Sequence, residues 1–107
     1  MILMNVGTYP PRECGIASFS KDLRDNVIKT GHSVWITALS DEKEYAYPEE
    51  VRFSIQQNDS EDYLKAAFLI NSSPVDLVIL QHEYGIFGGI DGALVLKFAT
   101  HLKKPYL

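Results

Sequence analysis

The chain has 107 residues, enough for one globular domain and too few for two. Its composition is globular, with 46% hydrophobic and 22% charged residues, and its net charge of −4 excludes the basic footprint of nucleic-acid-binding domains. The sequence has one cysteine and no run near the roughly 20 apolar residues of a membrane-spanning helix. We therefore expect a soluble, cytoplasmic protein without a disulfide framework.

The amino-terminal part predicts a strand, a loop and a helix. Residues 2–6 are mostly apolar, as a central parallel strand is. The loop Thr8–Cys14 contains a proline pair, which excludes a helix and an internal strand there. A helix is expected to open at Gly15 and to stop before Gly31. Its apolar residues recur at helical spacing: Ile16, Phe19, Leu23 and Val27.

Two further strands and a helix are expected next. Val34–Leu39 and Val51–Ile55 are the strands, joined by the charged and exposed connection Asp41–Glu50. Polar cap candidates precede a helix over Glu61–Asn71. Its predicted inner side comprises Leu64, Ala67, Phe68 and Ile70.

The last part predicts the strand Val75–Leu80 and a helix over Asp91–Lys103. Pro105–Leu107 has the pattern of a further strand, and the sequence stops there, so we expect a partial domain over residues 1–107. Because strands alternate with helices, the fold class is α/β, a Rossmann-like parallel sheet flanked by helices. The last helix carries one apolar stripe: Leu94, Val95, Phe98 and Leu102.

The first loop ends at a helix N-terminus, where unpaired N–H groups and the helix dipole favour an anion. A phosphate or carboxylate is therefore predicted at Gly15, Ile16 and Ala17, whose small glycine and alanine leave room for a ligand. A plain strand-to-helix turn is the alternative. The loop matches neither the dinucleotide-binding glycine fingerprint nor a P-loop.

The stretch QHEYGIFGG, residues 81–89, directly follows the strongly apolar strand over residues 75–80 and carries the main functional prediction. In open α/β sheets, ligands bind at the carboxyl ends of strands. His82 is suited to position or deprotonate a hydroxyl near neutral pH, and Glu83 to orient that imidazole or bind sugar hydroxyls. Gly88 and Gly89 would permit positive φ angles and close approach of a ligand. Backbone capping and a simple turn are the alternative.

Other reactive side chains are predicted to be structural. The histidines, among them His32 and His101, are widely separated in the sequence, and such spacing is unsuited to a metal site. Cys14 has no activating neighbour, and Trp35 stands inside a strand. Two glutamates, Glu42 and Glu50, are separated by seven residues, but a proline between them prevents a shared helix face, so we regard this spacing as coincidence.

Two segments, GTYPPRECGIASFSKDL (residues 7–23) and LQHEYGIFGGIDG (residues 80–92), resemble the amino-terminal domain of retaining glycosyltransferases with the GT-B fold, the group 1 (GT4) family. The two segments occur in the family's order, and the resemblance extends over nearly the whole chain. It implies a two-domain transferase whose amino-terminal domain supplies the acceptor side of a cleft. The nucleotide-sugar donor would bind mainly to a second domain, through a pair of glutamates separated by seven residues.

The resemblance also implies roles for individual residues. Gly15, Ile16 and Ala17 would approach the donor diphosphate, and His82 would lie near the transferred sugar as the catalytic residue. Metal and cofactor are not implied, and the acceptor would be a sugar or a lipid-linked molecule. Other substrate-binding residues would come from the same two loops: Glu83, Tyr84, Phe87, Gly88 and Gly89, with Arg12 and Glu13 as additional candidates.

The donor domain is absent from this sequence, so we expect the 107-residue chain alone to be inactive. Two other hypotheses for the function remain open. One is a nucleotide-binding α/β module without chemistry, and the other is an interaction domain that pairs with another subunit, for which the acidic, tyrosine-rich segment Asp41–Glu50 is suited. An unfinished fifth strand would leave a sheet edge open to self-association.

Overall fold

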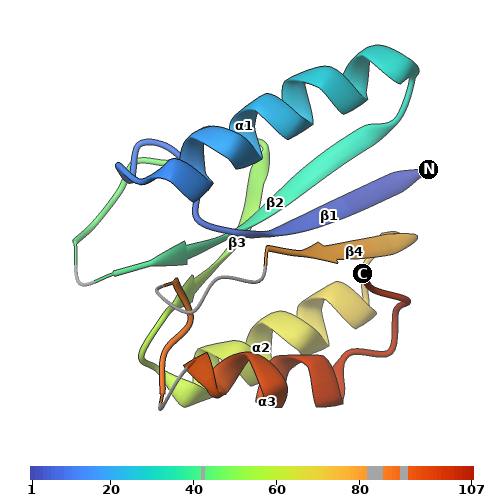
Figure 1. Ribbon diagram of the computed structural model, residues 1–107. Coiled ribbons are helices and arrows are strands. Elements are labelled where there is room, and N and C mark those ends of the chain that lie inside the picture. The colour runs from blue at the N-terminus through green and yellow to red at the C-terminus, as the bar shows by residue number, and fades with distance from the viewer. Residues whose placement is uncertain (42, 82–85, 90–91) are drawn as a thin grey trace.

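The computed structural model describes residues 1–41, 43–81, 86–89 and 92–107. Its centre is a sheet of four strands in the order β3-β2-β1-β4 (Figure 1). All neighbouring strands pair in parallel, which confirms the predicted Rossmann-like α/β class. The strands are β1 (Ile2–Gly7), β2 (Ser33–Ser40), β3 (Val51–Gln56) and β4 (Leu77–Leu80).

Helices cover both faces of this sheet (Figure 1). Helix α1 (Gly15–Val27), extended by the short 3-10 helix η1 (Ile28–Thr30), lies on one face. Helices α2 (Ser60–Asn71) and α3 (Leu94–His101) lie side by side on the other. No helix of the described residues is long and apolar enough to cross a membrane.

The two faces have separate apolar cores because successive side chains of a strand point to opposite sides. Met4 and Val6 of β1 pack with residues of α2 and α3, including Ile70 and Phe98. Leu3 of the same strand packs in the smaller cluster on the α1 side. The larger core is thus the one beneath the paired helices.

One predicted inward position is wrong, because Phe68 is 70% exposed. Phe19, one of the apolar residues at helical spacing in α1, is also 54% exposed. Helix α1 buries small residues, Ala17 and Ser20, so its phenylalanine points away from the sheet. Helix α2 buries the predicted Ala67 and Ile70, and it buries Tyr63 and Ala66 in place of Phe68, with the two alanines allowing close packing.

Element boundaries also differ from the expected ones. Helix α3 begins at Leu94, and residue 91, where the predicted helix starts, lies outside the described residues. Strand β4 begins at Leu77, two residues after the expected start. Asp76, just before it, bonds Ile2 twice: its N–H donates to the Ile2 carbonyl at 2.8 Å, and its Oδ2 accepts the Ile2 N–H at 2.7 Å. The predicted helix start at Gly15 is confirmed, as is the polar cap of α2, where Asp59 accepts a hydrogen bond from the Glu61 N–H.

The predicted strand at the carboxyl end is confirmed in its first residues. Tyr106 forms a parallel bridge with Val78 on the outer edge of β4. The Val78 N–H donates to the Pro105 carbonyl at 2.9 Å, and the Leu80 N–H donates to the Leu107 carbonyl at 3.0 Å. Residues 105–107 therefore lie along the sheet edge beyond β4.

Candidate functional site

The strand order places the carboxyl ends of β1 and β4, from which the two loops singled out by the sequence start, next to each other. Strand β1 has β2 on one side and β4 on the other, so the chain reverses its direction of winding between β1 and β4. Ligands of open α/β sheets bind outside the carboxyl ends of strands at such a reversal. The loop Thr8–Cys14 follows β1, and the stretch QHEYGIFGG follows β4.

Gln81 anchors the second loop to β1. Its backbone N–H donates to the Val6 carbonyl at 2.9 Å, and its Nε2 donates to Asn5 Oδ1 at 2.8 Å. A Cβ at Gly7 would lie 2.8 Å from Gln81 Cγ, closer than real side chains come. Gly7 is therefore the residue that lets Gln81 reach across the end of β1.

The floor below this junction is polar. Asn5, Thr8 and Ser20 are each at most 1% exposed, although they stand beside the apolar core. Within the described part of the chain, Asn5 Nδ2 and Ser20 Oγ have no hydrogen-bond partner. Buried polar groups in folded proteins almost always have a hydrogen-bond partner, so these two unpaired groups distinguish the junction from an ordinary strand-to-helix connection.

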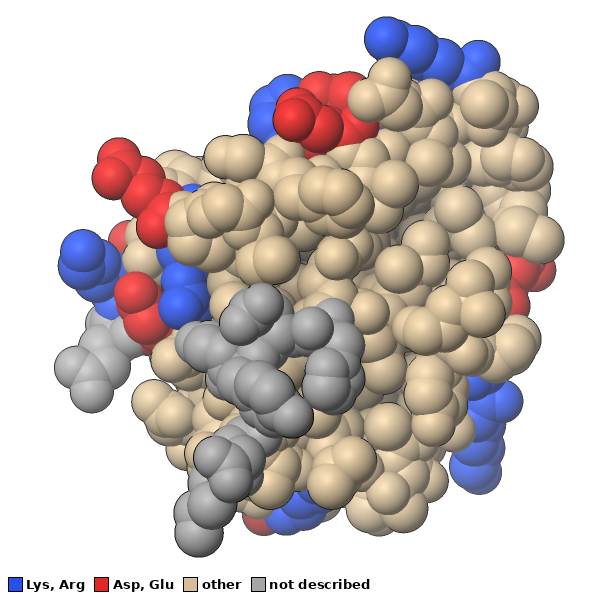
Figure 2. Space-filling model, viewed as in Figure 1, with Lys and Arg blue, Asp and Glu red and all other residues tan. Residues whose placement is uncertain are grey.

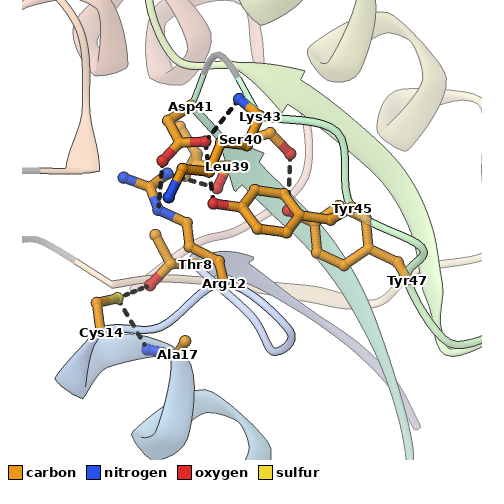
Figure 3. Close-up of polar contacts among 10 residues, drawn as sticks. All are labelled: Thr8, Arg12, Cys14, Ala17, Leu39, Ser40, Asp41, Lys43, Tyr45 and Tyr47. Atoms are coloured by element: carbon orange, nitrogen blue, oxygen red, sulfur yellow. Dashed lines mark hydrogen bonds and ion pairs between the residues drawn. The ribbon is translucent and has the colours of Figure 1, made fainter.

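The first turn of α1 opens beside the junction. Cys14 caps the helix, because its Sγ accepts the Ala17 N–H at 3.4 Å and lies 2.9 Å from Thr8 Oγ1 (Figure 3). A Cβ at Gly15 would meet nothing within 4 Å. Of the three predicted anion-binding residues, Ala17 is buried with its N–H taken by the cap. Gly15 and Ile16 belong to the first turn, whose N–H groups have no partner inside the helix.

A polar cleft of about 460 Å³ lies next to this turn, between the loops that follow β1 and β2. Charged side chains of both signs gather at this end of the molecule (Figure 2). Arg12 and Glu13, predicted as additional substrate-binding candidates, are both in the wall. The lining residues are Pro11, Arg12, Glu13, Cys14, Asp41, Lys43 and Tyr45.

Arg12 joins the two loops that form the cleft. Its Nη1 donates to the Leu39 carbonyl at 2.9 Å, and its Nε lies 4.0 Å from Asp41 Oδ2 (Figure 3). The other carboxylate oxygen of Asp41 accepts hydrogen bonds from the Lys43 N–H and the Tyr45 hydroxyl, each at 3.0 Å. The Lys43 N–H foremost, with the Tyr45 hydroxyl and Arg12, lowers the pKa of Asp41 below its ordinary value. Asp41 is thus held as an anion in the cleft wall.

Tyrosines fix the rest of this connection. Tyr47 and Ser40 share a hydrogen bond of 2.7 Å between their hydroxyls, and the rings of Tyr45 and Tyr47 lie 5.6 Å apart (Figure 3). The connection predicted only to be exposed is in fact tied to the carboxyl edge of the sheet. Sequence reasoning missed Asp41, Lys43 and Tyr45 as cleft residues. Their position directly after a predicted strand was the signal available.

The structure describes only part of QHEYGIFGG. His82, Glu83 and Tyr84 lie outside the described residues, so their predicted roles stay predictions. Phe87 is 6% exposed and packs in the core under α2 and α3. Gly89 has the positive φ of 85° that the sequence suggested for this pair.

Gly88 is needed for packing against the chain itself. A Cβ there would lie 1.9 Å from the Gln57 carbonyl oxygen, which no side chain tolerates. The Gly88 N–H donates to the Tyr63 hydroxyl at 3.0 Å, and that hydroxyl donates to the Gln57 carbonyl at 2.7 Å. Burial raises the pKa of Tyr63. The space beside Gly88, which was predicted to admit a ligand, is therefore filled by the loop before α2.

Of the residues set aside as structural, Cys14 lies in the cleft wall, whereas Trp35 and His101 lie away from the junction. Trp35 is half-buried against the core, with the Arg52 guanidinium carbon 4.3 Å from its ring centroid. His101 is exposed, with Nδ1 2.8 Å from the Lys97 carbonyl. Among the described residues, no three His, Cys, Asp or Glu side chains gather in a way that could hold a metal ion.

No protein-family model, curated protein or solved structure matches this chain.

Proposed function

We propose that this chain is the acceptor-side domain of a retaining glycosyltransferase of the GT-B type, which transfers a sugar from a nucleotide-sugar donor to an acceptor hydroxyl. The proposal rests mainly on one observation. The two segments that resemble the family meet where the strand order reverses, between β1 and β4. They are far apart in sequence, yet Gln81 of the second is hydrogen-bonded to Asn5 and Val6 just before the first.

The donor side of the proposal is supported by the first turn of α1. Gly15 has open space where a side chain would stand, so a diphosphate has room to approach its N–H and that of Ile16. His82 directly follows Gln81 in the sequence, and Gln81 is the residue hydrogen-bonded to β1. We assign to His82 the role of hydrogen-bonding the transferred sugar, and to Glu83 and Tyr84 contacts with the substrates.

The acceptor side is supported by the polar cleft. Sugar hydroxyls need fixed hydrogen-bonding groups and an aromatic surface, and the cleft wall offers Arg12, Asp41 and Tyr45 in a connected network. Because these groups already bind one another, their positions are set before a ligand arrives. Fixed groups of this kind reduce the entropy lost on binding.

The chain contains one side of such a cleft, so the test needs the complete reading frame. The gene is read past the codon for Leu107, and the whole product is assayed with nucleotide-sugar donors and simple sugar acceptors. We expect a second α/β domain, transfer with retention of the anomeric configuration, and loss of transfer in His82→Ala. Phe19→Ser, an exposed substitution on the outer side of α1, serves as the control and should leave transfer unchanged.

Two results would contradict the proposal. A stop codon after Leu107, with tight mononucleotide binding near Gly15 and no transfer, would favour a nucleotide-binding module. A stable homodimer without any response to nucleotides or sugars would favour an interaction domain. Equal rates of sugar transfer by the parent protein and by His82→Ala would show that His82 is not catalytic. The proposal that the chain belongs to a GT-B glycosyltransferase would not be affected by that result.

A further inference from the structure

The outer surface of α2 and α3 combines exposed apolar side chains with lysines. Phe68 of α2 is 70% exposed, and Leu96 of α3 is 65% exposed. Both helices lie on the same side of the sheet (Figure 1), and the exposure of these two side chains means that they point away from the core. Large exposed apolar side chains on one face indicate an interaction surface.

A groove of about 540 Å³ lies on this surface, near the carboxyl ends of the two helices. Asn71, the last residue of α2, connects this helix to the end of α3. Its Nδ2 donates to the His101 carbonyl at 2.9 Å, and its Oδ1 accepts the Lys103 N–H at 2.7 Å. These bonds keep Lys103 beside Phe68. The lining residues are Leu64, Phe68, Asn71, Ser72, His101 and Lys103.

The charge of this part of the chain is opposite to that of the whole. Residues 63–75 and 92–107 contain Lys65, Lys97, Lys103 and Lys104 but no Asp or Glu, although the net charge of the chain is −4. Lys65 and Lys103 are exposed. The acidic residues of α2, Glu61 and Asp62, lie in its first turn, at the end away from the groove. Glu83 and Asp91 lie outside the described residues.

We infer that the face formed by α2, α3 and residues 102–104 docks on an anionic phospholipid surface. Lysines attract lipid phosphates and anionic headgroups, and exposed phenylalanine and leucine enter the boundary between headgroups and acyl chains. Separate protruding side chains suit a deformable lipid surface better than a protein partner, which needs a complementary shape. This inference does not depend on the proposed transferase function.

The test is co-sedimentation of the chain with vesicles made of equal parts phosphatidylglycerol and phosphatidylcholine, compared with phosphatidylcholine alone. We expect binding to the anionic vesicles only, weakened as salt is added. Lys65→Glu/Lys103→Glu should lower the partition coefficient on the order of tenfold or more, because each lysine near an anionic surface contributes to binding. Phe68→Ser should lower it severalfold without affecting the fold, since the side chain is largely exposed.

Matched controls come from the opposite face of the sheet. Lys21→Glu/Lys29→Glu changes the charge equally on α1 and η1, and Phe19→Ser removes an exposed phenylalanine there. Both should bind like the parent chain. Equal binding to both vesicle types, or equal losses in the controls, would overturn the inference. Binding of a poly-glutamate peptide without binding of vesicles would also overturn it, in favour of an acidic protein partner.

Discussion

The Gly88 N–H, in the loop after β4, donates a 3.0 Å hydrogen bond to the Tyr63 hydroxyl of α2. The same hydroxyl donates to the Gln57 carbonyl at 2.7 Å, so one side chain joins the loop after β4 to the loop after β3. Tyr63 is fully buried, and no Cβ fits at Gly88. The end of QHEYGIFGG is therefore fixed from below by α2, while its beginning is fixed at β1 through Gln81.

Removing that hydroxyl should destabilise the fold. In Tyr63→Phe, the buried Gly88 N–H and Gln57 carbonyl both lose their partner, which costs about 1–3 kcal/mol. The measurement is the free energy of unfolding in urea. Tyr106→Phe, at a tyrosine 47% exposed, is the matched control and should be unchanged. Equal stability of the two variants would show that the Tyr63 hydroxyl is not a structural contact.

Adding a methyl group at Gly7 should disrupt the junction between β1 and β4. In Gly7→Ala the Cβ would stand 2.8 Å from Gln81 Cγ, so Gln81 must move away from Asn5. We expect a loss of about 1–3 kcal/mol, as for other overpacked sites. Gly15→Ala, where the Cβ meets open space, should instead stabilise the chain by about 0.4–1 kcal/mol. A Gly7→Ala chain as stable as its parent would contradict the close packing of Gln81 against Gly7.

Cys14 caps α1 with sulfur, a weak hydrogen-bond acceptor. Cys14→Ser places a stronger acceptor at the same position, and Cys14→Ala removes the cap. We expect the serine variant to exceed the alanine variant by about 1 kcal/mol, which corresponds to roughly 4–8 °C in Tm for a domain of this size. Thermal unfolding of both variants checks the order. The reverse order would mean that Cys14 contributes through packing alone.

The fold should lose stability in alkali. Tyr9 is 1% exposed and donates a 2.9 Å hydrogen bond to Glu50 Oε2, so burial first and that carboxylate second raise the pKa of Tyr9. The folded chain therefore keeps its proton where the unfolded chain, with a pKa of about 10, has lost it. This contribution to stability is complete below about pH 10 and falls above it by about 1.4 kcal/mol per pH unit.

Urea unfolding of the parent chain and Tyr9→Phe at about pH 8 and about pH 11 tests this dependence. Tyr9→Phe should lose less stability than the parent between the two values. Glu50→Gln should lie between them, because it removes the carboxylate and leaves the burial. Part of the alkaline loss should remain in Tyr9→Phe, since burial also raises the pKa of Tyr47 and Tyr63. Parallel losses in all three chains would contradict the role of Tyr9.

The sequence by itself determined the α/β class and the order of its elements. Runs such as Val34–Leu39 are apolar enough to be central strands, and residues at the ends of elements, such as Asp59 and Gly31, mark where helices begin and stop. These signals are local, because they depend on side chains within one turn or one strand. For the same reason, the first loop could be predicted to end at a helix N-terminus at Gly15.

Only the tertiary structure decided what those elements face and which loops meet. The stripe of α2 that points inward is set by the sheet and by α3, so Ala67 is buried and its neighbour Phe68 is exposed. Likewise, Arg12 reaches Leu39 and Asp41 only because β2 lies beside β1 in the sheet. Contacts between residues so far apart in the chain leave no periodic pattern in the sequence, so they depend on the packing of the whole fold.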